Sequence, residues 1–177
     1  QMKRVVILGS SGAGKTTLAN KISALTGLPI IHLDKHFWLP NWQARSNEEF
    51  ARRQRPLIAS DSWIFDGNNR NTLPIRLERA DTAILLDFPR WLCLFRILTR
   101  SAWYFRRTRE DMADGCKERF SWEFIKYVWN FPEHYRPSLF SALSNFKGQT
   151  IILKSPKDVR TFLKSLSRID TLRKFAS

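Results

Sequence analysis

The chain has 177 residues, of which 43% are hydrophobic and 26% are charged. This length suits one domain that removes about 70% of its unfolded surface from water, and no apolar run is long enough to cross a bilayer. Thirty Lys and Arg residues against 16 Asp and Glu residues give a net charge of +14, which favours anionic partners such as nucleotides or nucleic acids.

Cysteine content argues against a disulfide framework. Cys93 and Cys116 do not form a C-x-x-C pair, and three histidines are few for a metal protein. The first apolar run, Val5–Leu8, is shorter than the core of a secretion signal. We therefore expect a cytoplasmic protein with no membrane partner.

The predicted elements alternate along the chain between short strands and longer helices. The strand candidates are the apolar runs Val5–Leu8, Ile30–Leu33, Trp63–Phe65, Ala83–Leu86 and Ile151–Leu153. The helix candidates, placed by periodicity and by capping residues, are Lys15–Thr26, Asn47–Asp61 and Asp158–Ser167. Such alternation requires crossover connections, so it predicts a parallel five-stranded sheet inside a three-layer α/β/α fold.

The most specific motif lies between the first strand and the first helix. Residues 9–16 read Gly-Ser-Ser-Gly-Ala-Gly-Lys-Thr and fit the pattern G-x-x-x-x-G-K-[ST]. Glycines allow successive N–H groups to turn inward around an anion, and the helix N-terminus and Lys15 add positive charge. A ligand-free glycine turn is the alternative, but the strand and helix on either side favour a nucleoside triphosphate site. Its residues are Gly9, Ser10, Ser11, Gly12, Ala13, Gly14, Lys15, Thr16 and Thr17.

Two aspartates directly follow apolar strands. Asp66 ends the third strand, and Asp87 follows the fourth. The carboxyl ends of parallel strands border the ligand crevice in open α/β sheets. Either carboxylate can therefore hold Mg²⁺ through water, and the sequence pattern leaves the choice open.

The segment 91–146 departs from the alternating pattern. It contains four of the seven tryptophans and many arginines but no strand pattern, which predicts a helical insertion between the fourth and fifth strands. Phosphoryl-transfer enzymes commonly carry a lid at this position. Leu92, Phe95 and Leu98 have the spacing of a core-facing helix stripe. Arg96 and Arg100 are one turn apart, so both point from one helix face.

Several of these segments resemble known families. The segments Gly9–Thr16, Asp66–Arg70 and Arg96–Arg100 together resemble the small P-loop kinases of the adenylate-kinase-like and shikimate-kinase-like kind. Finer details look like the family of DNA topology modulation proteins: His32-Leu33-Asp34, Phe65–Asn68, Leu86–Arg90 and Leu153–Pro156. The resemblance covers most of the chain and implies one P-loop kinase-like domain over residues 1–177, with a helical lid at about residues 91–146.

The resemblance also implies roles for individual residues around Mg²⁺ and ATP. Lys15 is the phosphate lysine, Thr16 is a Mg²⁺ ligand, and Asp66 is the favoured metal-shell carboxylate. Arg70 grips the acceptor or the transferring phosphate. A further set covers the nucleotide: Arg96 over adenine, Pro156 on the opposite side of the ring, and Arg100 on the phosphates.

The acceptor region departs from the resemblance. Relatives that act on nucleoside monophosphates carry a threonine-glycine segment where this chain has residues 32–38, which argues against a monophosphate acceptor. Asp34 resembles the aspartate that orients an acceptor hydroxyl, and its alternative role is a helix or turn cap. Trp38 and Trp42 can stack on a planar acceptor or pack under the neighbouring helix.

Three functions fit this sequence. The first is a Mg²⁺-dependent kinase that transfers the γ-phosphoryl group of ATP to a small hydroxylated or nucleotide-like acceptor. The second is a nucleotide-regulated DNA-binding protein, which rests on the charge of +14 and the topology-modulation resemblance. The third is a nucleotide-binding module without catalysis. Any nucleic-acid binding by a kinase of this charge is expected to be weak and sequence-independent.

Overall fold

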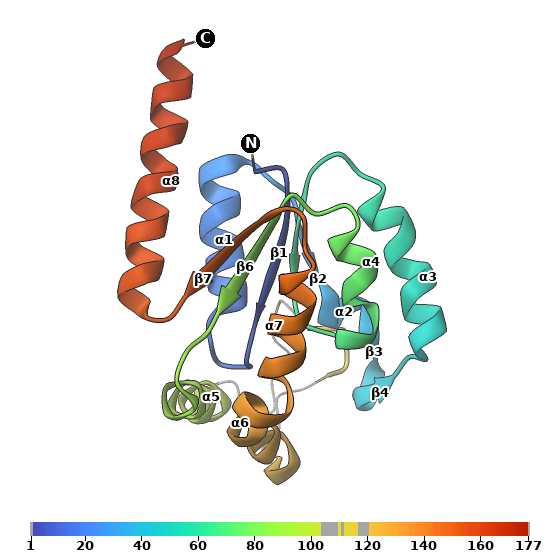
Figure 1. Ribbon diagram of the computed structural model, residues 1–177. Helices are drawn as coiled ribbons and strands as arrows, with labels where there is room; N and C mark the ends of the chain where they lie inside the picture. Colours follow the sequence, from blue (N-terminus) through green and yellow to red (C-terminus); the bar gives the residue numbers. More distant parts are fainter. Residues whose placement is uncertain (1, 104–109, 111, 117–120, 177) are drawn as a thin grey trace.

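Five parallel strands form the centre of the molecule (Figure 1). The computed structural model describes residues 2–103, 110, 112–116 and 121–176, with side chains as far as Ile169. The strand order is β2-β5-β1-β6-β7, and the bounds are β1 Arg4–Gly9, β2 Ile30–His32, β5 Trp63–Asp66, β6 Thr82–Leu86 and β7 Gln149–Leu153. The prediction of a five-stranded parallel sheet is confirmed.

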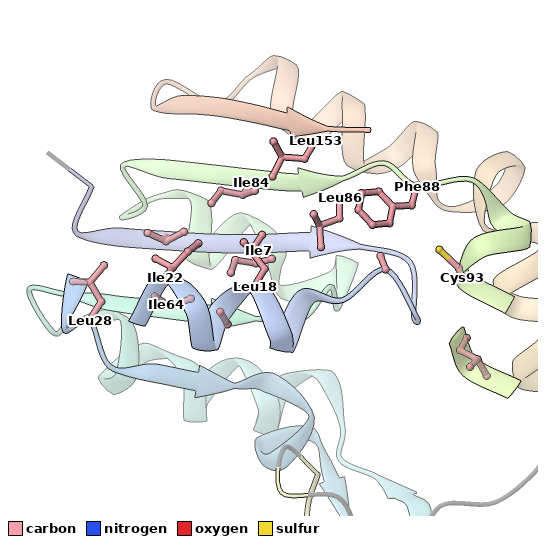
Figure 2. Packing of buried hydrophobic residues seen from close by; sticks show 14 of the residues in the cluster. Ile7, Leu18, Ile22, Leu28, Ile64, Ile84, Leu86, Phe88, Cys93 and Leu153 are labelled. Carbon is pink, nitrogen blue, oxygen red and sulfur yellow. The ribbon is translucent and has the colours of Figure 1, made fainter. Parts of the chain in front are cut away.

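Helices cover both faces of the sheet and make the predicted three layers (Figure 1). One face carries α1 (Lys15–Thr26) and α8 (Pro156–Ala176), and the other carries α3 (Asn47–Ile58), α4 (Leu73–Leu77) and α7 (Arg136–Ser144). Side chains alternate along a strand, so the even and odd residues of β1 enter different cores. Val5 and Ile7 pack toward α1 (Figure 2), whereas Val6 and Leu8 pack toward α3 and α7.

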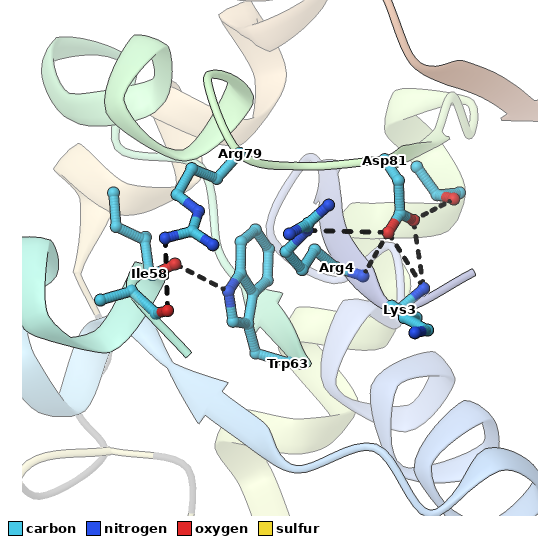
Figure 3. A network of polar contacts seen from close by, with 8 residues as sticks. Lys3, Arg4, Ile58, Trp63, Arg79 and Asp81 are labelled. Atoms are coloured by element: carbon cyan, nitrogen blue, oxygen red, sulfur yellow. Dashed lines mark hydrogen bonds and ion pairs between the residues drawn. The ribbon is translucent and has the colours of Figure 1, made fainter. Parts of the chain in front are cut away.

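The amino-terminal edge of the sheet is held by polar contacts far from the phosphate loop (Figure 3). The carboxylate of Asp81 accepts hydrogen bonds from the backbone N–H groups of Lys3 and Arg4, the latter at 2.8 Å. The Trp63 indole N–H donates to the carbonyl of Ile58 at 3.3 Å. These contacts hold the starts of β1 and β6 in place. They lie at the edge of the sheet opposite the carboxyl ends of the strands, where the candidate ligand site lies.

The segment between β2 and α3 is more structured than the sequence pattern predicts. It contains α2 (Leu33–Phe37) and a small hairpin of β3 (Trp38–Leu39) and β4 (Gln43–Ala44), joined by the 3-10 turn η1 (Pro40–Trp42). The predicted strand ran to Leu33, but β2 ends at His32 because Leu33 begins α2 and buries its side chain in the core. Asp34 therefore lies in the first turn of a helix and not at a strand end.

The predicted insertion contains α5 (Arg90–Trp103) and α6 (Trp122–His134), which lie beyond the carboxyl edge of the sheet (Figure 1). Residues 104–109, 111 and 117–120 of this insertion lie outside the described residues. Helix α7 instead packs on the sheet, with Leu139 and Leu143 in the core. Within the described part of the chain, no helix is both long and apolar enough to span a membrane.

The core stripe predicted for this insertion is partly wrong. Leu92 packs against the core, but Phe95 is 62% exposed and Leu98 is 47% exposed. The buried residues of α5 are Cys93 and Ile97, because the helix turns this face toward the phosphate loop. The opposite, aromatic face of α5 is therefore left exposed.

Candidate active site

The phosphate loop connects β1 to α1 and packs against the first turns of α5. Gly12 has a φ of +80°, and a Cβ placed on it would lie 2.3 Å from the carbonyl oxygen of Cys93. Gly14, with a φ of +92°, leads into α1, where the N–H of Leu18 donates to its carbonyl at 2.9 Å. Only glycine accommodates both the left-handed backbone and the close approach at Gly12. The need for glycine at position 12 thus follows from the close contact between the loop and α5.

Lys15 folds back over this loop. Its Nζ donates to the carbonyl oxygens of Gly9 and Ser10, both at 3.0 Å. Burial lowers the pKa of Lys15, and the nearby charge of Arg100 lowers it further, whereas the carboxylates of Asp66 and Asp34 raise it. The ammonium group is therefore held against the loop carbonyls, and the charges of Asp66, Asp34 and Arg100 all influence its pKa.

Thr16, Asp66 and His32 converge on one carboxylate oxygen. The Thr16 hydroxyl donates to Oδ2 of Asp66 at 2.6 Å, and Nδ1 of His32 lies 3.0 Å from the same oxygen. Burial alone would raise the pKa of Asp66, but the contacts with His32, Lys15 and Thr16 together hold it below its usual range. Asp66 is thus an ionised carboxylate at neutral pH. With the Thr16 hydroxyl it offers the hard oxygen donors that suit Mg²⁺.

Asp87, the other candidate carboxylate, has a different partner. Its two oxygens accept hydrogen bonds from Nε and Nη2 of Arg136, at 2.7 and 2.8 Å. This bidentate pair joins the end of β6 to the start of α7. In the structure, Asp66 therefore contacts Thr16, whereas Asp87 pairs with Arg136 and so joins β6 to α7.

Of the three arginines of α5, Arg96 contacts the phosphate loop directly. Arg96 donates from Nη1 to the carbonyl of Ala13 at 3.2 Å, and its guanidinium lies 5.4 Å from the centre of the Phe88 ring. The charge of Arg100 acts on Lys15. Helix α5 therefore adds the guanidinium of Arg96 to the loop, and the charge of Arg100 lowers the pKa of Lys15.

The remaining predicted site residues lie in different surroundings. Arg70 is directed toward α6 and α7: it lies 4.5 Å from the centre of the Tyr135 ring and donates to the His134 carbonyl at 3.5 Å. Asp34 is exposed in α2, and its charge acts on Lys15. Pro156 is the first residue of α8, where a missing N–H costs nothing.

The aromatic residues of the hairpin pack against one another. Trp38 and Trp42 meet edge to face, with ring centres 5.5 Å apart. Both also contact a small cluster formed by Met112, Ala113 and Cys116. In this structure the two indoles therefore pack against each other and against residues 112–116, whereas the packing alternative had placed them under the neighbouring helix.

Two further residues of this site were not predicted from the sequence. His32 pairs with Asp66 in the register of β2 and β5, so an alignment of the two strands could have revealed their contact. Asn68 hydrogen-bonds the backbone of Gly9 at the start of the phosphate loop. Nothing in the local sequence around Asn68 signals this contact, because 59 residues separate the partners.

Several solved kinase structures have a similar fold over nearly the whole chain. The shikimate kinase from Acinetobacter baumannii is 14% identical, with a TM-score of 0.60, and the match covers 98% of this chain and 96% of that one. The shikimate kinase from Bacteroides thetaiotaomicron is 16% identical, with a TM-score of 0.57 and coverage of 96% and 98%. A gluconokinase from Sinorhizobium meliloti 1021 is 15% identical, with a TM-score of 0.56 and coverage of 99% and 97%.

No protein-family model and no curated protein sequence matches the chain. At identities this low, the structural likeness establishes the fold alone. The chain therefore has the fold of these kinases, and its chemistry has to be argued from the site.

Proposed function

We propose that the protein is an ATP-dependent phosphotransferase that moves the γ-phosphoryl group to a hydroxyl group of a small molecule. The observation that carries this proposal is the convergence of Lys15, Arg96 and the Thr16–Asp66 pair on one glycine loop. Phosphoryl transfer asks a protein mainly for positioning and for neutralisation of charge. This arrangement supplies both.

The donor side of the reaction follows from these contacts. Lys15 would turn from the carbonyls of Gly9 and Ser10 to phosphate oxygens. The N–H groups of the loop would donate hydrogen bonds to the other phosphate oxygens. Thr16 and Asp66 would hold Mg²⁺, which when bound neutralises charge on the transferring phosphate. Arg96 and Arg100 would approach the nucleotide from α5, and Pro156 at the start of α8 would line the opposite side of the adenine ring.

For the acceptor, we propose a small hydroxylated molecule oriented by Asp34. This carboxylate is exposed in the first turn of α2, and its charge reaches Lys15. A carboxylate in this position would accept a hydrogen bond from an incoming hydroxyl, the first requirement of a general base. Arg70 would bind the acceptor or the transferring phosphate after its guanidinium moves away from the Tyr135 ring.

The narrower resemblance to DNA topology modulation proteins has no support from the comparisons. DNA binding would rest on the net charge of +14, which attracts any polyanion and specifies none. The kinase proposal, by contrast, uses a specific set of contacts within one domain with a helical lid. Residence in the cytoplasm stays a prediction from the cysteine content.

The test is a screen for acceptor-dependent release of ADP from Mg·ATP, with hydroxylated metabolites, nucleosides and nucleotides as candidate acceptors. Lys15→Ala is the control variant, because it removes one charge from the loop and leaves its glycines in place. The loss of a charge-assisted contact, about 1.5–3 kcal/mol, should weaken ATP binding roughly ten- to hundredfold in a calorimetric titration. Equal ATP affinity of the variant and the unaltered protein contradicts the proposal.

A further inference from the structure

The first glycine of the phosphate loop is held by a single side-chain carboxamide. Oδ1 of Asn68 accepts from the N–H of Gly9 at 3.0 Å, and Nδ2 of Asn68 donates to the carbonyl of Gly9 at 2.7 Å. One planar group therefore binds both the donor and the acceptor of the same residue. This pairing fixes the orientation of the carboxamide as well as that of the loop, since a flipped amide would lose both bonds.

A buried arginine hydrogen-bonds the backbone at Asn68. The Arg76 guanidinium, which is fully buried, donates to the backbone carbonyls of Asn68 and Asn69. Its other amino group donates to Gln54 at 2.9 Å and to Thr72 at 3.1 Å. Because this network is inside the protein, the backbone at Asn68 has little freedom to move.

Asn68 also lies near the helical insertion. Burial raises the pKa of Tyr127 on α6, and the nearby Asn68 side chain opposes this rise. The Tyr127 ring packs edge to face against Tyr135, with centres 4.6 Å apart, and against Phe131 at 6.0 Å.

The carbonyl of Gly9 has two donors, Nδ2 of Asn68 and Nζ of Lys15. When Lys15 turns to a bound phosphate, this carbonyl loses one of them. We infer that Asn68 is a positioning residue that keeps the Gly9 carbonyl satisfied and the loop in its binding shape when Lys15 leaves. The inference rests on the proposed triphosphate site and adds to it a residue that touches no substrate.

The test is a double-mutant cycle on Mg·ATP affinity with Lys15→Ala, Asn68→Ala and the variant that combines them. In the protein with Lys15, Asn68→Ala should weaken Mg·ATP binding about tenfold, because Lys15 then leaves a buried carbonyl without a donor. In the Lys15→Ala background the same change should cost less than about twofold. A purely structural role for Asn68 would instead give the same factor in both backgrounds.

Asn71→Ala is the matched control, because this exposed asparagine lies in the same segment and its side chain donates to Asn47 at 3.3 Å, away from Gly9. It should leave Mg·ATP affinity unchanged. If Asn68→Ala does not fold, Asn68→Ser replaces it, with a side chain too short to span both backbone groups of Gly9. Amide exchange at Gly9 in the nucleotide-free protein gives a second readout and should accelerate in either variant.

The outcomes separate the two proposals. The triphosphate site stands if the unaltered protein binds Mg·ATP and Lys15→Ala weakens that binding. The positioning role is nevertheless wrong if Asn68→Ala binds Mg·ATP as the unaltered protein does. It is also wrong if Asn68→Ala weakens binding by the same factor in both backgrounds. If the unaltered protein does not bind Mg·ATP, the proposed function fails and the inference fails with it. Unchanged exchange at Gly9 also overturns the positioning role.

Discussion

At the scale of single residues, two aspartates in similar sequence contexts differ in the folded chain by their partners. Asp66 is buried and accepts from the Thr16 hydroxyl, whereas Asp87 faces the guanidinium of Arg136. Asp66 ends a strand and Asp87 directly follows one, so the local pattern cannot separate them. Their different contacts lead to different expected effects of the same substitution.

We predict that Asp66→Asn lowers Mg²⁺-dependent ADP release roughly ten- to hundredfold, because it removes the charge that orients Thr16 and would attract Mg²⁺. Asp87→Asn should leave turnover nearly unchanged. It should lower the Tm by roughly 2–4 °C, since the Arg136 side chain is 42% exposed and such pairs contribute at most about 1 kcal/mol. The measurements are Mg²⁺ titrations of ADP release and thermal unfolding.

The reverse ranking of the two variants would move the metal role to Asp87. Unchanged turnover in both variants would remove the metal shell from the proposed mechanism. Each variant also serves as the control for the other, because the substitution is chemically identical.

At the scale of secondary-structure elements, α5 determines how the insertion meets the site. Its Cys93 and Ile97 are buried, and Arg96 reaches the loop at Ala13. The opposite face exposes Trp91 and Phe95, which are 66% and 62% exposed. One helix thus places cations over the phosphate loop while its aromatic residues face away from it.

We predict that Arg96→Ala combined with Arg100→Ala reduces Mg·ATP affinity by tenfold or more, because two cations leave the phosphate site. DNA affinity should change only modestly. The check is a calorimetric titration with Mg·ATP beside fluorescence anisotropy with a labelled duplex. Arg90→Ala is the control on the same helix, since Arg90 pairs with Glu133 and stacks on Trp129. A larger loss for DNA than for ATP would favour the DNA-binding function.

At the scale of the whole molecule, the ligand should stabilise the fold, because the site joins β1, β5, α1 and α5. Any ligand that binds only the folded state adds about 2.7 kcal/mol at a concentration of 100 times its Kd. This site draws its contacts from segments far apart in the chain, from Gly9 to Asp66 and Arg96. Ligand binding and global unfolding are therefore expected to be coupled.

We predict that saturating Mg·ATP raises the Tm by roughly 5–10 °C in a thermal unfolding scan. The Lys15→Ala variant should show a much smaller shift at the same concentration. Duplex DNA should stabilise the protein only at low salt, because backbone contacts depend on counterion release. A DNA-induced shift that persists at moderate salt, with none from Mg·ATP, would contradict the kinase proposal.

The sequence by itself determined the features that depend on neighbours in the chain. Glycine spacing and flanking elements located the glycine loop between β1 and α1, and apolar runs located all five strands of the sheet. The helix Lys15–Thr26 has the bounds predicted from its periodicity and from Gly27, which ends it in a left-handed conformation. These signals are local, because backbone conformation and strand or helix periodicity are set within a few residues.

The tertiary structure alone decided the contacts between residues far apart in the chain. It paired Asp87 with Arg136, joined His32 to Asp66, and placed Asn68 on Gly9. It also turned Phe95 and Leu98 outward on a helix whose spacing suited a core. A periodic pattern shows that a helix has an apolar face, but which face is buried depends on how the whole chain packs around the sheet.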